Sequence, residues 1–295
     1  KQAFIAPVLG ALEVLMEVLI PLLMANIIDI GIMEGNMPYI IKMGILLVVM
    51  AMLALLFGAL AGKMGAIASA GYAKNLRHDI FYKIQEFSFG NIDHFSTSSL
   101  VTRLTTDITN VQMAYMFTVR LLARAPIMVV LSWIMTATIN LKIAFCLLVT
   151  IPVLGGILIF IAKKAHPHFI QVFDEYDVLN NTVQENVNAA RVVKAYVREE
   201  HENEKFHKIS LKVFDLFTKA EKIVAWNSPV MQFVMYAVIM ILVYIGGKGI
   251  VAKTMETGAL TSIIVYALQI IGSLMMVTFV FVMIMIAGAS TDRIT

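Results

Sequence analysis

The sequence predicts an all-α integral membrane protein with six membrane-spanning helices. Hydrophobic residues make up 59% of the chain and charged residues only 15%, with a mean hydropathy of +0.82. Soluble domains have about 25% charged residues, so this composition is typical of a chain that lies in a bilayer. Six apolar stretches reach the ~20 residues that a helix needs to cross the hydrocarbon core. In chain order, the predicted spans are residues 4–32, 40–62, 111–139, 143–162, 223–245 and 260–288.

The connections between these spans differ in length and charge. Three are short, at Gly31–Pro38, Asn140–Lys142 and Gly246–Gly258, and with their immediate flanks they hold four Lys or Arg residues. The long connections Lys63–Asn110 and Lys163–Lys222 hold five and ten. Because cytosolic loops carry an excess of Lys and Arg, we expect both long connections and both chain ends to be cytosolic.

The long connections are rich in helix formers, so we expect each membrane helix to continue beyond the membrane. About 25 further residues would extend a helix by ~38 Å at 1.5 Å per residue. Each connection would then be a cytosolic hairpin with a small transverse element at its tip. The first hairpin is expected to turn at Gly90–Ser99 and the second near Ala189–Tyr196.

The second tip carries one apolar stripe on an otherwise polar helix. Val187, Ala190, Val193 and Val197 recur at three- and four-residue steps, with charges elsewhere. Such spacing places the four side chains on one face of a helix. This pattern favours a short docking element for a soluble partner.

Four spans contain a proline that removes a backbone donor and tends to kink the helix. These are Pro21, Pro126, Pro152 and Pro229. Membrane helices tolerate such residues where neighbouring helices satisfy the freed carbonyl groups. One interpretation is that the prolines only shape the helices; the alternative is a gating hinge at Asn227–Pro229.

Four charged residues lie inside predicted spans. Glu13 and Glu17 are one turn apart in the first helix, and Arg120 and Arg124 are one turn apart in the third. Counted from the outer ends of both helices, Glu17 is level with Arg124 and Glu13 with Arg120. One hypothesis is a structural ladder of two ion pairs. A second is that these charges meet substrate in a transport cavity, and a third is proton coupling through a glutamate.

Further polar, amphipathic or flexible side chains are candidates for the same cavity. Methionine is flexible and polarizable and suits surfaces that bind varied ligands, although ordinary packing also explains its abundance here. The cavity candidates besides the four charges are Trp133, Gln232, Tyr236, Gln269 and Met276.

The sequence shows no catalytic or metal-binding pattern. The six histidines have no zinc-site spacing, and the single cysteine, Cys146, lies in an apolar run. The closest approach to a phosphate-binding loop is Gly247–Thr254, which has Ala252 where the second glycine should stand. We therefore expect no metal, no cofactor and no catalytic residue in this chain, and no nucleic-acid partner.

Several motifs, in order along the whole chain, resemble one known family. They are PLLMANIIDIGI at Pro21–Ile32, LRHDIFYKIQEFSF at Leu76–Phe89, LLARAP at Leu121–Pro126, QENVNAARVVKAYVREEHENEKF at Gln184–Phe206, and ASTDRI at Ala289–Ile294. The chain resembles the transmembrane half of an ATP-binding cassette (ABC) exporter of the six-helix type with long intracellular loops. It departs from the family pattern at Thr97–Ser99, where Ser-Thr-Gly is usual, and at Ala189–Ala190, where Gly-Ile is usual.

The resemblance implies that the two hairpin tips are coupling helices that dock into clefts on ATPase domains. The residues expected to make these contacts are Ile92, Asp93, His94 and Phe95 at the first tip and Arg191, Val192, Lys194 and Tyr196 at the second. It also implies pairing with a second copy or a homologous half, and alternating access driven by ATP.

Residues 1–295 are accordingly expected to form one transmembrane domain, with the nucleotide-binding domain absent from this chain. ATP and Mg²⁺ would bind that missing domain, whose phosphate-binding motif is expected about 50–80 residues further on. The expected setting is a bacterial plasma membrane, and the expected substrate is an amphipathic or hydrophobic small molecule, as for a multidrug or lipid exporter. The alternatives are an ion-coupled secondary transporter, which would often show inverted repeats, and a ligand-sensing membrane domain.

Overall fold

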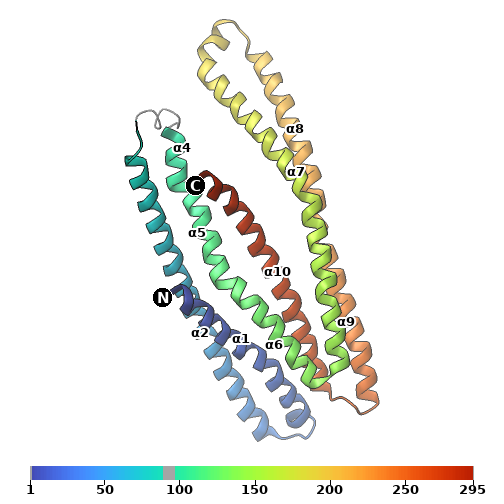
Figure 1. Ribbon diagram of the computed structural model, residues 1–295. Helices are drawn as coiled ribbons and strands as arrows, with labels where there is room; N and C mark the ends of the chain where they lie inside the picture. The colour runs from blue at the N-terminus through green and yellow to red at the C-terminus, as the bar shows by residue number, and fades with distance from the viewer. Residues whose placement is uncertain (1, 89–96, 295) are drawn as a thin grey trace. The chain divides into compact units, whose positions relative to one another are not determined.

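A computed structural model describes residues 2–88 and 97–294 of the protein. Within these residues every regular element is a helix, which confirms the all-α prediction. Six helical stretches are long and apolar enough to cross a membrane, and each contains or overlaps one predicted span. Figure 1 shows these helices coloured along the chain.

The chain divides into two compact units. The first contains residues Lys1–Ile151 and Val238–Thr295, and the second contains Pro152–Ala237. The elements of the first unit are α1 (Gln2–Asn26), the π-helix η1 (Ile27–Ile32), α2 (Met37–Gln85), α4 (Thr97–Thr102), the π-helix η2 (Arg103–Asp107), α5 (Ile108–Phe117), the π-helix η3 (Thr118–Leu122), α6 (Ala123–Ile139), the start of α7 (Leu141–Ala195), the end of α9 (Asn227–Val251) and α10 (Thr257–Ile294).

Helix α2 confirms that a membrane helix continues without interruption into the polar connection. It begins after Asn36, whose side-chain oxygen accepts a hydrogen bond from the Tyr39 N–H at 3.2 Å, with Pro38 in the first turn. It then runs for 49 residues to Gln85, well past the predicted span 40–62. No proline follows Pro38 within it, so nothing removes a backbone donor along this length.

Small residues allow α2 to pack closely against its neighbours. Its buried residues are Gly58, Ala61, Gly65, Ser69 and Ala73, at three- and four-residue spacing. Small side chains on one face let two helix backbones approach, which is how membrane helices gain packing energy without a hydrophobic driving force. The small-residue face of α2 therefore holds α1 and α5 near it.

The centre of the first unit is an apolar cluster from three helices. Val14 and Val18 of α1, Met128 of α6 and Tyr266 of α10 are buried together. These helices come from distant parts of the sequence, so the cluster joins the beginning and the end of the chain into one body.

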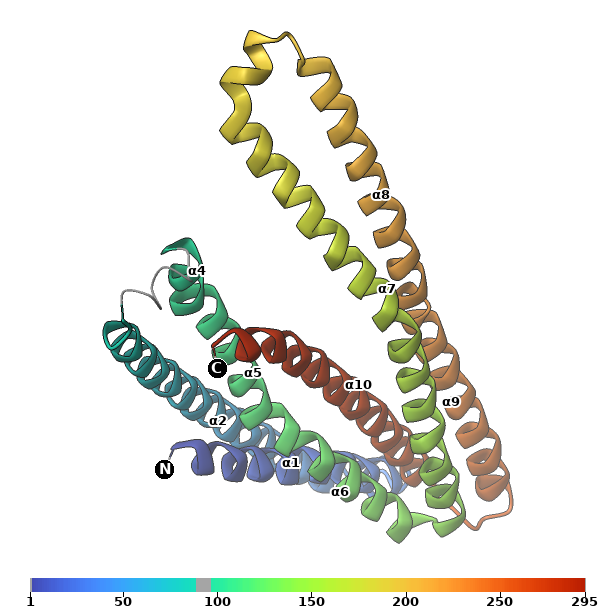
Figure 2. The same cartoon turned by 45° about the horizontal axis from the view of Figure 1, so that its top comes forward.

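The second unit is a long antiparallel helix pair. It contains α7 from Pro152, α8 (Glu199–Ala225) and the first part of α9. Figures 1 and 2 show α7 and α8 side by side up to the turn that joins them. Ion pairs of 2.7 Å between Lys212 and Glu175 and of 3.1 Å between Lys205 and Glu185 link the two helices.

The turn of this hairpin lies later than the sequence indicated. Helix α7 continues to Ala195, so most of the stretch Ala189–Tyr196 forms its last turns, where a separate transverse helix was expected. The chain reverses at Tyr196–Arg198, with Val197 in the left-handed region at φ 52°. The segment lacks a proline or glycine that would end the helix earlier.

The predicted span 223–245 is broken near its start. Helix α8 ends at Ala225 and α9 begins at Asn227, with Trp226 between them. Pro229 has no N–H to donate to the carbonyl four residues earlier, which is that of Ala225. The break is consistent with the proposed hinge at Asn227–Pro229, whose movement stays a prediction.

Candidate functional site

Three of the four charged residues in the predicted spans meet at Arg124. Its Nη2 atom lies 2.7 and 2.6 Å from the two carboxylate oxygens of Glu17. The same nitrogen lies 3.5 Å from an oxygen of Glu13. The three side chains are partly buried between α1 and α6, so one guanidinium serves two carboxylates inside the helix bundle.

Arg120 does not form the second rung of the predicted ladder. Its guanidinium carbon lies 3.5 Å from where a Cβ on Gly62 would be, against α2, and its side chain is largely exposed. Within residues 2–88 and 97–294 it forms no ion pair. It lies in η3, where the wider π-helical turn changes the angle between it and Arg124.

The Glu13 carboxylate instead lies against α2 at Gly58. A Cβ on Gly58 would lie 2.8 Å from one carboxylate oxygen of Glu13 and 2.9 Å from its carboxyl carbon. A side chain at position 58 would therefore displace the Glu13 carboxylate from this position. The Glu13 carboxylate and the Arg120 guanidinium therefore rest one turn apart on α2, at Gly58 and Gly62.

Two uncharged candidates complete this charge cluster, which we define as Glu13, Glu17, Arg124, Gln269 and Met276. The Gln269 amide nitrogen lies 3.4 Å from the Glu17 carbonyl oxygen, and the Met276 sulfur lies 3.8 Å from Arg124 Nη1. Five of the nine predicted cavity residues are thus brought together.

The contacts of α10 with α1 explain how α1 tolerates Pro21. Because Pro21 has no N–H, the carbonyl of Glu17 loses its usual helical donor. The Gln269 amide lies in position to replace it. On the same face of α10, Tyr266 donates to the Val18 carbonyl at 2.9 Å and Ser262 to the Pro21 carbonyl at 2.6 Å. Pro21 in the sequence predicts that a neighbouring helix supplies such donors, but no pattern in the sequence singles out Ser262 or Tyr266.

The N-terminus of α10 is hydrogen-bonded to η1, which directly follows α1. Asp29 of η1 accepts a hydrogen bond from the Gly258 N–H at 2.7 Å. A Cβ on Gly258 would lie 2.5 Å from the Ala25 carbonyl oxygen and 2.8 Å from its Cα. A carboxylate at a helix N-terminus is favourable because it meets unpaired N–H groups and the positive end of the helix dipole.

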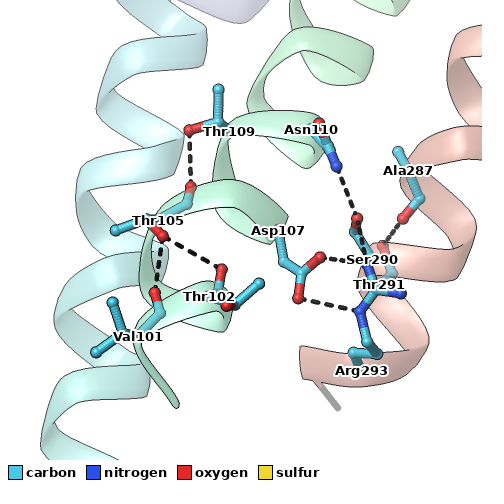
Figure 3. A network of polar contacts seen from close by, with 10 residues as sticks. All are labelled: Val101, Thr102, Thr105, Asp107, Thr109, Asn110, Ala287, Ser290, Thr291 and Arg293. Carbon is cyan, nitrogen blue, oxygen red and sulfur yellow. Dashed lines mark hydrogen bonds and ion pairs between the residues drawn. The ribbon is translucent and has the colours of Figure 1, made fainter. Parts of the chain in front are cut away.

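The C-terminal end of α10 is held by a polar network with η2 and α5, shown in Figure 3. Arg293 donates to both carboxylate oxygens of Asp107, at 3.1 and 2.5 Å, and to Ser290 at 3.3 Å. Asn110 also donates to Ser290, at 3.1 Å. Asp107 is fully buried while Arg293 is half exposed, so the network brings one end of α10 against the start of α5.

The family profile described as ABC transporter transmembrane region matches residues 3–274. The chain belongs to the ABC transporter transmembrane family. A protein of Bacillus subtilis named as an uncharacterized ABC transporter ATP-binding protein, YfiB, is 33% identical over 99% of this chain and 51% of its own length. An uncharacterized ABC transporter ATP-binding protein of Mycobacterium tuberculosis, MT1311, is 27% identical over 97% of this chain and 49% of its own length. The multidrug resistance-like ATP-binding protein MdlA of Buchnera aphidicola is 29% identical over 77% of this chain and 39% of its own length.

The chain spans about half the length of the first two of these ABC transporter relatives. The stretch Gly247–Thr254, with its partial likeness to a phosphate-binding loop, forms the end of α9 and the turn after it.

The remaining candidate residues of this ABC transporter domain that the structure describes are divided between the two units. The Trp133 indole donates to the Ala144 carbonyl at 2.9 Å and so joins α6 to the start of α7. Gln232 and Tyr236 belong to the second unit, where both are exposed. At the second hairpin tip, the exposed side chains are Arg191, Val192, Lys194 and Tyr196. The first-tip candidates Ile92, Asp93, His94 and Phe95 lie outside the described residues.

Proposed function

We propose that this chain is the substrate-translocating part of an ATP-driven exporter. The observation that carries the proposal is the family match over residues 3–274, together with relatives named as ATP-binding proteins of about twice its length. In the complete transporter, two such halves would enclose one cavity, and nucleotide-binding domains with ATP and Mg²⁺ would lie at the cytosolic tips. The proposed location is the plasma membrane of a bacterium, with both ends of the chain in the cytosol.

The second hairpin tip is the proposed contact with an ATPase domain. Val192 and Tyr196 are 58% and 75% exposed, and Val187 of the apolar stripe is 69% exposed. Exposed apolar side chains at the end of a charged helix pair favour a protein partner at that position. Force applied there would be carried by the hairpin, because Glu175 and Glu185 of α7 are paired to lysines of α8.

The charge cluster and Arg120 are the proposed polar part of the substrate cavity. Arg120 is the exposed member of the intramembrane arginines, and such residues usually face a bundle interior or a water-filled cavity. The cavity would accept an amphipathic or hydrophobic molecule, a proposal supported by the multidrug resistance-like name of one relative. ATP would act by making different contacts in the inward- and outward-facing states, since a ligand shifts an equilibrium only through its differential affinity.

The experiment is ATP-driven uptake by the complete transporter in proteoliposomes. A fluorescent amphipathic dye is added outside vesicles in which the hairpin tips face outward, with ATP or with a non-hydrolysable ATP analogue. We expect dye accumulation with ATP and none with the analogue. Uptake driven by an ion gradient without ATP would support a secondary transporter instead, and dye-stimulated ATP hydrolysis without dye movement would support a sensor.

A further inference from the structure

Two sets of lysines on the α7–α8 hairpin differ in their partners. Toward the turn, ion pairs of 3.1, 2.8 and 2.7 Å to glutamates of the hairpin are formed by Lys205, Lys208 and Lys212. Toward the membrane span, Lys164, Lys219 and Lys222 are exposed and form no ion pair within residues 2–88 and 97–294. This second set therefore receives no counter-charge from the described part of the chain.

The unpaired lysines lie at the level where the hairpin meets the membrane surface. Lys164 is 21 residues from Ile143, and Lys222 is 23 residues from Ile245, which are the predicted outer ends of their spans. At 1.5 Å per residue, these lengths are about 32 and 35 Å. The hydrocarbon core is ~30 Å thick and the bilayer with its headgroups ~40–45 Å, so both residues lie in the headgroup layer on the hairpin side.

The three lysines lie on one side of the helix pair. Ala165 of α7 and Ala220 of α8 are 5% and 0% exposed, and they mark the line along which the two helices meet. Lys164 and Lys219 each directly precede one of these alanines. Because the helices are antiparallel (Figure 1), a step of one residue back from the contact line, about 100°, turns toward the same side on both. Lys222 is three residues after Lys219 and shares its face.

The neighbouring carboxylates of α8 do not neutralise these lysines. Glu221 directly follows Ala220, so the same geometry turns it to the opposite side of the pair. Asp215 lies about one turn before Lys219, and no ion pair joins the two side chains. An anion that neutralises the three lysines has therefore to come from the surroundings.

Exposed aromatic rings continue the lysine side into the membrane span. Trp226 is seven residues after Lys219 and Phe233 seven residues after Trp226, and Trp226 keeps helical backbone angles, so all three share one face. The two aromatic residues are 66% and 74% exposed. On α7, Phe160 is 65% exposed, and the Lys164 ammonium lies 5.9 Å from its ring centroid. Tryptophan favours the membrane–water interface, so this surface offers cations at headgroup level and apolar rings below them.

We propose that Lys164, Lys219 and Lys222 bind the phosphate of an anionic phospholipid, whose acyl chains lie against Phe160 and Phe233. Basic side chains at a membrane surface attract anionic headgroups, and the adjoining apolar rings favour a lipid over a soluble anion. The occupant is a resident lipid of the bilayer and is not cargo. The site does not depend on the proposed export activity, because the hairpin crosses the headgroup layer whatever the protein transports.

The test measures which lipid lies next to Trp226. The complete transporter is held in nanodiscs of phosphatidylcholine and phosphatidylglycerol, in which one of the two lipids carries brominated acyl chains that quench tryptophan emission. The emission of Trp226→Phe in the same discs is subtracted, so that the remaining signal comes from Trp226. Comparing the two brominated lipids gives the preference for the anionic lipid at this position.

The variants separate local charge from overall charge. Lys219→Gln/Lys222→Gln removes two charges of the proposed site, and Lys164→Gln removes the charge on the other helix. The matched control is Lys205→Gln/Lys208→Gln, which removes the same charge from the same helix beyond the headgroup layer. Thermal unfolding checks that each variant is folded.

We expect the unmodified protein to favour phosphatidylglycerol at Trp226 by at least about tenfold. Lys219→Gln/Lys222→Gln should lower this preference at least about fivefold and Lys164→Gln about threefold, while the control stays within about twofold of the unmodified protein. Equal quenching by the two lipids, or equal losses in the site variant and the control, would overturn the proposal. Quenching by neither lipid would also overturn it, because a second copy or another protein would then cover this face.

A second measurement needs no variant. Raising the salt concentration from about 0.1 to about 1 M shortens the screening length from about 10 to about 3 Å, so the preference for phosphatidylglycerol should fall severalfold. An excess of soluble glycerol phosphate should leave the preference unchanged. A preference that does not respond to salt would contradict binding through the lysines, and displacement by glycerol phosphate would show that they take a free phosphate instead of a lipid.

Discussion

Glu17 and Arg124 show how a charged pair can be kept inside an apolar helix bundle. Two contacts of 2.6 and 2.7 Å join them, whereas Glu13 reaches the same nitrogen only at 3.5 Å. A charge at the centre of a membrane helix costs about 2.5–3.5 kcal/mol on insertion scales, so the close pair offsets more of that cost than the distant one. The two glutamates should therefore differ in their effects on stability.

Replacing Glu17 with Gln should destabilise the protein by about 2–4 kcal/mol, because Arg124 would lose its close partner while still partly buried. Glu13→Gln should cost clearly less, since its contact is longer. The measurement is thermal unfolding of the complete transporter carrying either change. Equal effects of the two changes would contradict this assignment, and an altered substrate response with unchanged stability would favour the cavity role for Glu17.

A second prediction at the scale of one residue concerns the stability effect of replacing Gly258. Gly258→Ala should destabilise the protein by about 1–3 kcal/mol, because the new methyl group would lie 2.5 Å from the Ala25 carbonyl oxygen. Gly272→Ala, on the same helix, is the control, since a Cβ there has no neighbour within 4 Å. It should be neutral or stabilising by up to about 1 kcal/mol. The measurement is again thermal unfolding; a harmless Gly258→Ala would show that α1 does not lie this close to α10.

At the scale of elements, α10 connects distant segments of the first unit through hydrogen bonds at its start, middle and end. Its N-terminus bonds to Asp29 of η1, its middle supplies donors to α1, and its last turns bond to Asp107 of η2. The face of α10 toward α1 carries Ser262, Tyr266 and Gln269, at the spacing of successive helical turns. This arrangement predicts coupling between α10 and the proline of α1.

Gln269→Leu should destabilise the unmodified protein by about 1–2 kcal/mol, because the Glu17 carbonyl would lose the donor that compensates for Pro21. In a Pro21→Ala background, the helix itself can supply that donor, so the same change should cost less. A double-mutant cycle of unfolding free energies measures the difference. If the effects of the two changes on the unfolding free energy are additive, Gln269 does not donate to the Glu17 carbonyl.

Replacing Arg293 should destabilise the protein more than replacing its partner Asp107. Arg293→Gln leaves a fully buried carboxylate without its cation and should cost about 3 kcal/mol or more. Asp107→Asn leaves an arginine that is half exposed and can be solvated, so it should cost less. Unfolding of both single variants and the double variant tests this order, and most of the cost of Arg293→Gln should disappear in the Asp107→Asn background. The reverse order would show that the carboxylate is not the buried partner.

The sequence was most informative where a single repeating pattern decides the structure. Span lengths and uninterrupted helix formers predicted the six helices and the continuation of α2 and α7 beyond the apolar runs. Counting residues from the helix ends also predicted that Glu17 meets Arg124. Residue counting could not predict η3, because its sequence TVRLL fits an α-helix as well as a π-helix, and so it placed Arg120 beside Glu13.

Contacts between distant segments were also outside the reach of the sequence. Asp107 and Arg293 are 186 residues apart, and no periodicity links them. The need for glycine at Gly258 is set by another helix, since a Cβ there would meet the backbone of α1 at Ala25. Such requirements become visible only when the helices are packed.

At the scale of the whole molecule, the proposed transport cycle depends on the exposed tip of the α7–α8 hairpin as the place where an ATPase domain transmits force. The family match and the length of the relatives support that view, and the exposure of Val192 and Tyr196 makes the contact possible. The polar interior of the first unit would then respond to movement that begins outside the membrane.

The most direct measurement is site-specific cross-linking in the complete transporter. Tyr196→Cys is introduced after other cysteines, including Cys146, are replaced, and the thiol is coupled to a benzophenone maleimide. After illumination, mass spectrometry identifies the attached peptide. We predict attachment to the nucleotide-binding domain, in a yield that changes when ATP is added. Attachment only to membrane helices or to lipid would contradict it.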